Sequence, residues 1–152
     1  RDARLESHEL GSNLRMSEVT AAIGRVQLQR LEGWLERRRG TANLYTQAFS
    51  NLPGIRPPKI RENTQHAWHQ YCLLVDEPEA LRAMLDERGI DSRVYYAQPC
   101  HRQGVYSNHP QHNDKFEVTD DVASRLVAIP IHHQLTENEV ERIIDAVTTI
   151  QS

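Results

Sequence analysis

One helical pattern occupies the first third of the chain and limits what the rest can fold into. From residue 28 to residue 52, side chains three and four residues apart are apolar except at Arg38, and this spacing places them on one side of an α-helix. We therefore predict one long helix over residues 17–51, with Ser17 as its N-cap and Glu18 in its first turn. The stripe consists of Leu28, Leu31, Leu35, Ala42, Tyr45, Phe49 and Leu52.

A second apolar strip lies in the N-terminal half of the same pattern. It is formed by Val19, Ala22, Ile23 and Val26. A helix that is apolar on two sides is usually covered on both. We therefore expect other polypeptide to pack on the beginning of this helix.

The remaining two thirds of the chain mix short strands and short helices. Buried or alternating runs predict strands over residues 68–75, 90–96 and 127–131. Helices are predicted from Pro78, over residues 118–126, and after Thr136, which forms a capping box with Glu139. The fold class is α/β or α+β, with a small sheet of three or four strands packed on helices. The pattern does not fix whether the strands run parallel or antiparallel.

Composition excludes several classes of protein. The 152 residues suffice for one domain with its own core, and 38% of them are hydrophobic and 26% charged. No stretch holds the roughly 18 consecutive apolar residues of a membrane span. The net charge of −3 argues against binding to nucleic acid. Only two cysteines occur, Cys72 and Cys100, and they match no CxxC pattern, so we expect a reduced, cytoplasmic setting.

Candidate sites are few when each segment is taken alone. The eight histidines show no zinc-type spacing, so we predict no metal site. The segment Gly11-x-Asn13-x-Arg15 precedes a helix N-terminus, where an amide, a guanidinium and free backbone N–H groups suit an anion. The same residues also suit helix capping beside a surface arginine.

A series of segments in order carries more information than any one of them. Together they strongly resemble the C-terminal region of the DegT/DnrJ/EryC1/StrS aminotransferases, a sugar aminotransferase family of the fold-type I pyridoxal phosphate class. The resemblance covers nearly the whole chain. The segments are GSNLRMSE at 11–18, AAIG at 21–24, LPGI at 52–55, HAWHQY at 66–71, VYYAQPCH at 94–101 and IPI at 129–131, followed by Leu135-Thr136.

The resemblance implies a reaction and a division of labour. The family moves an amino group, usually from glutamate, to a keto group on a nucleotide-linked sugar, with pyridoxal 5'-phosphate as the electron sink. The chain would be the small C-terminal domain, with a loop over residues 1–16, the long helix over 17–51, and a sheet with helices over 55–152. The Schiff-base lysine belongs to a large domain that would precede Arg1. Neither Lys59 nor Lys115 has a matching context, so this piece would carry no catalytic residue and be inactive alone.

The resemblance also implies site residues. Asn13 and Arg15 would reach across a homodimer to the cofactor phosphate in the partner's site, so that the two subunits share each active site. Tyr95, Tyr96 and His101 would line the pocket of the nucleotide-sugar substrate, with Tyr95 standing where a histidine is common.

Two alternatives remain at this stage. A relative that dehydrates the sugar with pyridoxal phosphate would differ at the lysine position, which lies outside this chain. A non-catalytic module could instead oligomerise or sense a ligand through the long helix. Separated from the large domain, the chain is expected to self-associate through the apolar surface around Val19, Ile23 and Val26.

Overall fold

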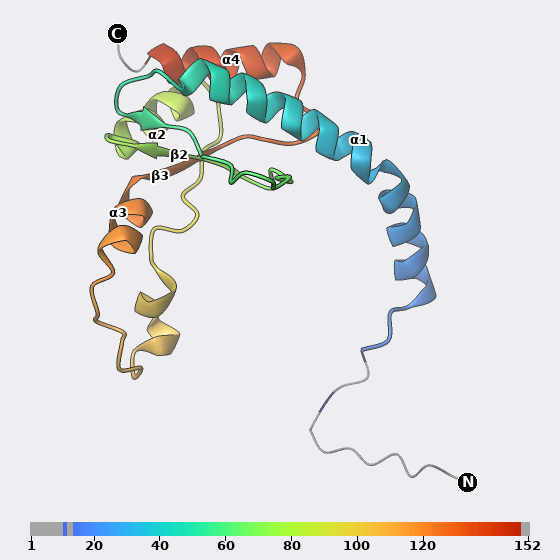
Figure 1. Ribbon diagram of the computed structural model, residues 1–152, viewed down its shortest axis with the longest axis horizontal. Helices are drawn as coiled ribbons and strands as arrows, with labels where there is room; N and C mark the ends of the chain where they lie inside the picture. The colour runs from blue at the N-terminus through green and yellow to red at the C-terminus, as the bar shows by residue number, and fades with distance from the viewer. Residues whose placement is uncertain (1–10, 12–13, 150–152) are drawn as a thin grey trace. The chain divides into compact units, whose positions relative to one another are not determined.

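Helix α1 (Glu18–Phe49) is the longest element of the computed structural model, which describes residue 11 and residues 14–149 (Figure 1). The chain divides into two compact units, residues 1–32 and 33–152. Because the boundary falls within α1, the helix begins in the first unit and ends in the second. Its bounds lie within two residues of the predicted 17–51.

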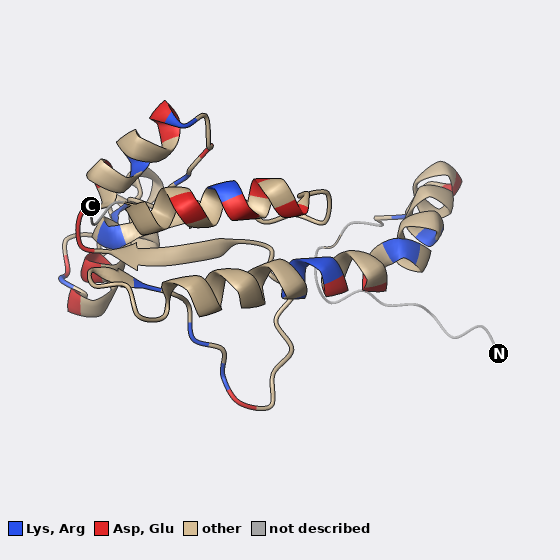
Figure 2. Cartoon of the chain, turned by 90° about the horizontal axis from the view of Figure 1, so that it is seen from above, with Lys and Arg blue, Asp and Glu red and all other residues tan. Residues whose placement is uncertain are grey.

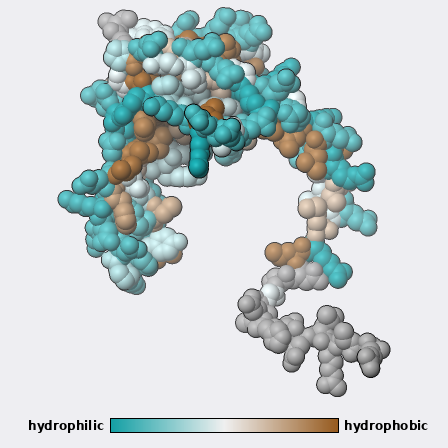
Figure 3. Space-filling model, in the orientation of Figure 1, coloured by the Kyte–Doolittle hydropathy of each residue, from teal (hydrophilic) through white to brown (hydrophobic). Residues whose placement is uncertain are grey.

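The first unit consists, in its described part, of the start of α1 and the residues leading into it. Ser17 caps the helix, since its Oγ accepts a hydrogen bond from the backbone N–H of Thr20 at 3.2 Å. The apolar side chains of this half of α1 reach the surface (Figure 3). Five large apolar side chains are exposed here, namely Val19 (70%), Ile23 (55%), Val26 (48%), Leu28 (68%) and Leu31 (41%).

The second unit buries the last turns of α1. No charged side chain occurs from Gly40 to Phe49 (Figure 2), and Ala42, Tyr45 and Phe49 are fully buried. The Tyr45 hydroxyl donates to the carbonyl oxygen of Pro130 at 3.0 Å. Burial, helped by the neighbouring Tyr71, raises the pKa of Tyr45 well above its ordinary value, so the phenol remains a neutral donor.

A three-stranded antiparallel sheet forms the centre of this unit. Its order is β1 (Ile55–Arg56), β2 (Tyr71–Val75) and β3 (Leu126–Ile129). Ile55 pairs with Val75, and Tyr71 pairs with Ile129. Alternate residues of β2 are buried and half-buried, so one face of the sheet meets the core. This resolves the strand direction, which the sequence pattern had left open.

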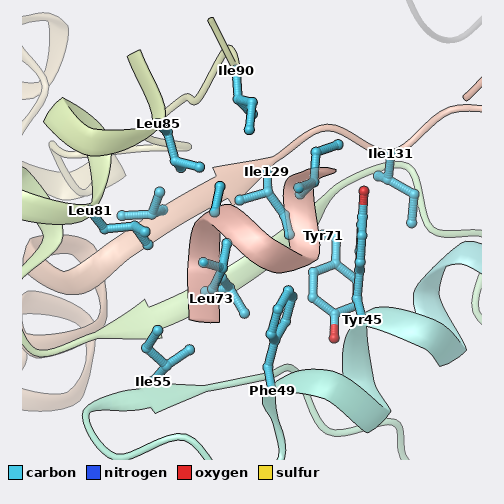
Figure 4. Packing of buried hydrophobic residues seen from close by; sticks show 14 of the residues in the cluster. Tyr45, Phe49, Ile55, Tyr71, Leu73, Leu81, Leu85, Ile90, Ile129 and Ile131 are labelled. Carbon is cyan, nitrogen blue, oxygen red and sulfur yellow. The ribbon is translucent and has the colours of Figure 1, made fainter. Parts of the chain in front are cut away.

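Helices supply the rest of the core. They are α2 (Pro78–Glu87), α3 (Glu117–Arg125) and α4 (Glu137–Thr148), with two short 3-10 turns, η1 (Cys100–Arg102) and η2 (Gly104–Tyr106). The predicted capping box is present, since Thr136 and Glu139 exchange hydrogen bonds at the start of α4. Side chains of α1, α2 and α4 pack with those of the sheet in one cluster (Figure 4). The predicted fold class, mixed α and β with a small sheet on helices, is confirmed.

Two predicted strands differ from the structure. The strand predicted over 68–75 begins only at Tyr71, because Trp68 has a left-handed backbone with φ of 48°. The strand predicted over 90–96 is reduced to one bridge, in which Arg93 and Ala128 exchange two backbone hydrogen bonds of 3.0 and 2.7 Å. The chain then turns at Tyr95 and Tyr96, which ends the pairing. Strand β1 was not predicted.

Within the described residues, no helix is both long and apolar enough to span a bilayer.

Candidate functional site

A cavity of about 460 Å³ lies in the second unit, beside the outer edge of β3. This volume is within the range of small-molecule sites. Its apolar wall includes Ile90, Ile129 and Ile131, which Figure 4 shows at one side of the core. The remaining lining residues are His69, Gln70, Gly89, Asp91, Arg93, Tyr95, Ala128, Pro130, His132, Leu135, Glu139, Arg142 and Ile143.

Tyr95 is the predicted site residue that the structure brings to this cavity. The bridge between Arg93 and Ala128 fixes the segment before it against β3. Tyr95 is half-buried, and its ring meets the ring of Tyr96 edge-on, with centroids 5.5 Å apart. Tyr96 itself is 71% exposed and does not line the cavity. The pair therefore presents one phenol to the cavity and the other to the surface.

Charged groups surround the cavity, and several are already paired. Arg93 forms an ion pair with Asp91 at 3.1 Å, and Arg142 donates to the carbonyl oxygen of Arg88 at 3.1 Å. The backbone N–H of Thr136, and then its hydroxyl, donate to Glu139 and lower the pKa of that carboxyl.

His101 lies in the loop between Gln98 and Lys115. Its Nε2 is 3.2 Å from the carbonyl oxygen of Asp114, and its ring packs edge-on against Phe116 with centroids 4.7 Å apart. The next residue, Arg102, forms an ion pair with Asp120 at 2.8 Å. These contacts hold the imidazole within its own loop, and His101 does not line the cavity.

Of the two predicted cofactor residues, Arg15 belongs to the first unit. Arg15 is exposed and lies two residues before the Ser17 cap. Asn13 falls outside the described residues. Neither lysine of the chain lines the cavity, and both Lys59 and Lys115 are exposed.

No group of three or more His, Cys, Asp or Glu side chains within the described ranges could hold a metal ion. Both cysteines are free thiols, and burial raises the pKa of the Cys72 thiol. The polar side chains that line the cavity carry imidazole, guanidinium, phenol, amide and carboxylate groups.

The comparison with protein families decides what kind of chain this is. The model described as the DegT/DnrJ/EryC1/StrS aminotransferase family matches residues 1–148. The chain belongs to the DegT/DnrJ/EryC1/StrS aminotransferase family. The resemblance found in the sequence is therefore confirmed.

Curated relatives of this DegT/DnrJ/EryC1/StrS chain include sugar transaminases. It is 32% identical over 142 residues to a dTDP-3-amino-3,4,6-trideoxy-alpha-D-glucose transaminase from Streptomyces venezuelae, covering 93% of this chain and 38% of that protein. It is 34% identical over 137 residues to a dTDP-3-amino-3,6-dideoxy-alpha-D-galactopyranose transaminase from Aneurinibacillus thermoaerophilus, covering 90% and 37%. The chain thus spans less than two fifths of the length of these relatives.

A solved structure has the same fold. The Streptomyces venezuelae protein DesV, crystallised in complex with a ketimine intermediate, superposes with a TM-score of 0.88 at 29% identity. The match covers 98% of this chain and 40% of that one.

Sequence reasoning missed several cavity residues of this family member. Arg93 and Arg142 line it without having been singled out. His69 was quoted within the resemblance segment 66–71, and His132 was considered only among the eight histidines; neither was assigned to a site. One signal was available, because His132 directly follows the strand predicted over 127–131, where side chains often reach a site; Arg93 lies within the strand predicted over 90–96. The position of Arg142 on the cavity side of α4 depends on how the helices pack, which the pattern does not give.

Proposed function

We propose that the full-length protein is a pyridoxal-phosphate-dependent aminotransferase that moves an amino group from glutamate to a keto group on a nucleotide-linked sugar. In this proposal residues 1–152 form its small C-terminal domain, with a loop over 1–16, the long helix over 17–51 and the sheet with its helices over 55–152. The observation that carries the proposal is the family match over residues 1–148. The transaminase names of two relatives support the substrate class.

The residues of this chain fit one part of a pyridoxal phosphate site. Arg15 lies next to the capped N-terminus of α1, and a guanidinium beside a helix N-terminus suits a phosphate. We assign Arg15 and Asn13 to that phosphate, reaching into the site of a homodimer partner. The cofactor supplies an electron sink when it is bound.

The amine that anchors the cofactor is assigned to polypeptide outside this chain. Both lysines here are exposed, and neither lines the cavity. We therefore expect the chain alone to be inactive in amino transfer.

The sugar nucleotide is assigned to the side of the molecule that carries Tyr95, Tyr96 and His101. A phenol can donate to a hydroxyl or phosphate oxygen, and Tyr95 offers one at the cavity. Tyr96 is free to meet a ligand at the surface, since it is 71% exposed. His101 would contact substrate only with the nitrogen that Asp114 does not occupy.

The setting we propose for the enzyme is the cytoplasm. Both thiols of the chain are free, as a reducing compartment would keep them.

The test uses the full-length protein. We expect it to carry the visible absorbance of bound pyridoxal phosphate and to form an amino sugar nucleotide from a keto-sugar nucleotide in the presence of glutamate. The matched control is a variant in which the cofactor lysine outside this chain is replaced by alanine. A colourless protein without cofactor would reject the proposal. A coloured protein that removes a hydroxyl without adding an amino group would instead be a dehydratase.

A further inference from the structure

The chain enters β2 through Trp68 and His69, and these two residues break the alternation of the strand. Along β2 the side chains of Tyr71, Leu73 and Val75 are buried. A regular strand continued backwards would therefore turn His69 into the core and Trp68 away from it. The structure shows the reverse, because Trp68 is 3% exposed within the core cluster, whereas His69 is exposed and lines the cavity.

This reversal comes from the left-handed backbone of Trp68. Its φ of 48° is one that a bulky residue rarely adopts. Two hydrogen bonds hold the peptide groups on either side. The Trp68 N–H donates to Nδ1 of His66 at 3.0 Å, and the Trp68 carbonyl accepts from Nη1 of Arg38 at 2.9 Å.

Ring contacts fix the indole as well. The His66 ring lies 4.3 Å from the Trp68 ring, and Tyr71 packs on it at 5.2 Å, measured between centroids. A strained backbone conformation persists only where several surrounding contacts hold it in place. Here the hydrogen bonds with His66 and Arg38 hold the backbone of Trp68 in this conformation. As a result, His69 lies on the side of the turn that faces the cavity.

His69 shares the cavity with Tyr95, Arg93 and Arg142. An imidazole there can donate an N–H to a phosphate or hydroxyl oxygen. Its own position is set by the turn, because its side chain is exposed and no core packing holds it.

We propose that His69 is a binding residue for the diphosphate-linked sugar, and that His66 is a positioning residue that acts through the left-handed turn at Trp68. The ligand class in this proposal rests on the proposed function. The role of His66 rests on the geometry of residues 66–69 alone.

Binding is measured on the full-length protein loaded with pyridoxal phosphate, with UDP and dTDP as probes in calorimetry and with KM for a keto-sugar nucleotide. His69→Ala should weaken diphosphate binding or raise KM by about tenfold, the scale of one hydrogen bond to a charged group. A loss with UDP and dTDP places the contact at the diphosphate, and a rise in KM alone places it at the sugar. His109→Ala is the matched control, since that histidine is exposed and does not line the cavity.

His66 is tested by replacement and rescue. His66→Ala should reproduce the loss, whereas His66→Asn should restore binding, since its side-chain oxygen can accept from the Trp68 N–H. The double variant His66→Ala/His69→Ala should bind no worse than His69→Ala. Hydrogen exchange of the Trp68 amide should be at least about tenfold faster in His66→Ala than in wild type or His66→Asn.

Distinct results would overturn each part. An active transaminase in which His69→Ala binds and turns over like the wild type removes the binding role. Additive losses in the double variant, or unchanged exchange at Trp68, remove the positioning role. A full-length protein without cofactor or transaminase activity rejects the proposed function, while the exchange measurement still tests the role of His66.

Discussion

Apolar side chains three and four residues apart on α1 are exposed at Val19, Ile23 and Val26 but buried at Ala42, Tyr45 and Phe49, although the spacing is the same in both halves. In the second half Tyr45 and Phe49 are fully buried against the sheet. In the first half Val19, Ile23 and Val26 are about half or more exposed. The periodicity of a helix therefore shows which side is apolar but not which polypeptide covers it. In the proposed full-length protein, polypeptide outside residues 1–152 would cover the first half.

The largest expected effect concerns stability. Phe49→Ala should lower the free energy of unfolding of the chain by about 3–5 kcal/mol, the cost of a cavity at a buried aromatic residue. Leu28→Ala, at a 68% exposed position of the same helix, should cost less than about 0.5 kcal/mol. Urea denaturation of the two variants measures the difference. Equal losses would mean that the two halves of α1 do not differ.

The next effect concerns association. The chain expressed alone should self-associate through the exposed strip, and replacing Val19, Ile23 and Val26 together by glutamine should weaken that association by about tenfold or more. Sedimentation over a range of concentrations measures it, with Val118→Gln as the control for an exposed valine outside α1. A chain that stays monomeric before any substitution would contradict the expectation.

Helix caps should show the same contrast on a smaller scale. Thr136→Ala removes the cap of α4, which packs on the core through Val140 and Ile143, and should cost about 1 kcal/mol of global stability. Ser17→Ala removes the cap of α1 in the exposed half and should change the global unfolding midpoint little, while raising local fraying. Chemical denaturation reports the first, and hydrogen exchange over residues 18–21 reports the second. A Ser17→Ala loss as large as that of Thr136→Ala would show that the first turns of α1 unfold together with the core.

The smallest effect is a pH dependence at α4. Because hydrogen bonds from Thr136 lower the pKa of Glu139 in the folded state, the carboxylate stabilises the fold above its ordinary pKa. This contribution is lost as pH falls below about 4.5 and through the folded-state pKa. Glu139→Gln should remove this part of the acid sensitivity, whereas Glu141→Gln, on the exposed side of α4, should retain it. Unfolding midpoints measured from neutral to acidic pH compare the variants.

Local signals in the sequence were sufficient for much of the fold. The caps at Ser17 and Thr136, the long helix and the buried strand before Val75 all depend on residues close in sequence. Strand β1 was missed because it holds two residues and is followed by Pro57. Its pairing with β2 is long-range, and no local sequence pattern predicts it.

The candidate site was harder to predict from the sequence, again because it depends on long-range contacts. The cavity joins residues from four separate segments, and only Tyr95 was assigned to a substrate pocket beforehand. His101 was grouped with Tyr95 by the family resemblance, yet Asp114 and Phe116 hold it inside its loop. The turn at Trp68 depends on Arg38, thirty residues away, and strand propensity alone favours continuing β2 through it.

Three contacts made by α1 hold one wall of the cavity in place. The Tyr45 hydroxyl holds the carbonyl of Pro130, Arg37 donates to the carbonyl of His133 at 3.3 Å, and Trp34 stacks on the His133 ring. Between these anchors lie Ile131 and His132, which form part of the cavity wall. That wall is consequently assembled when the helix docks during folding. Ligand binding then costs little conformational entropy, because this wall of the cavity is already ordered.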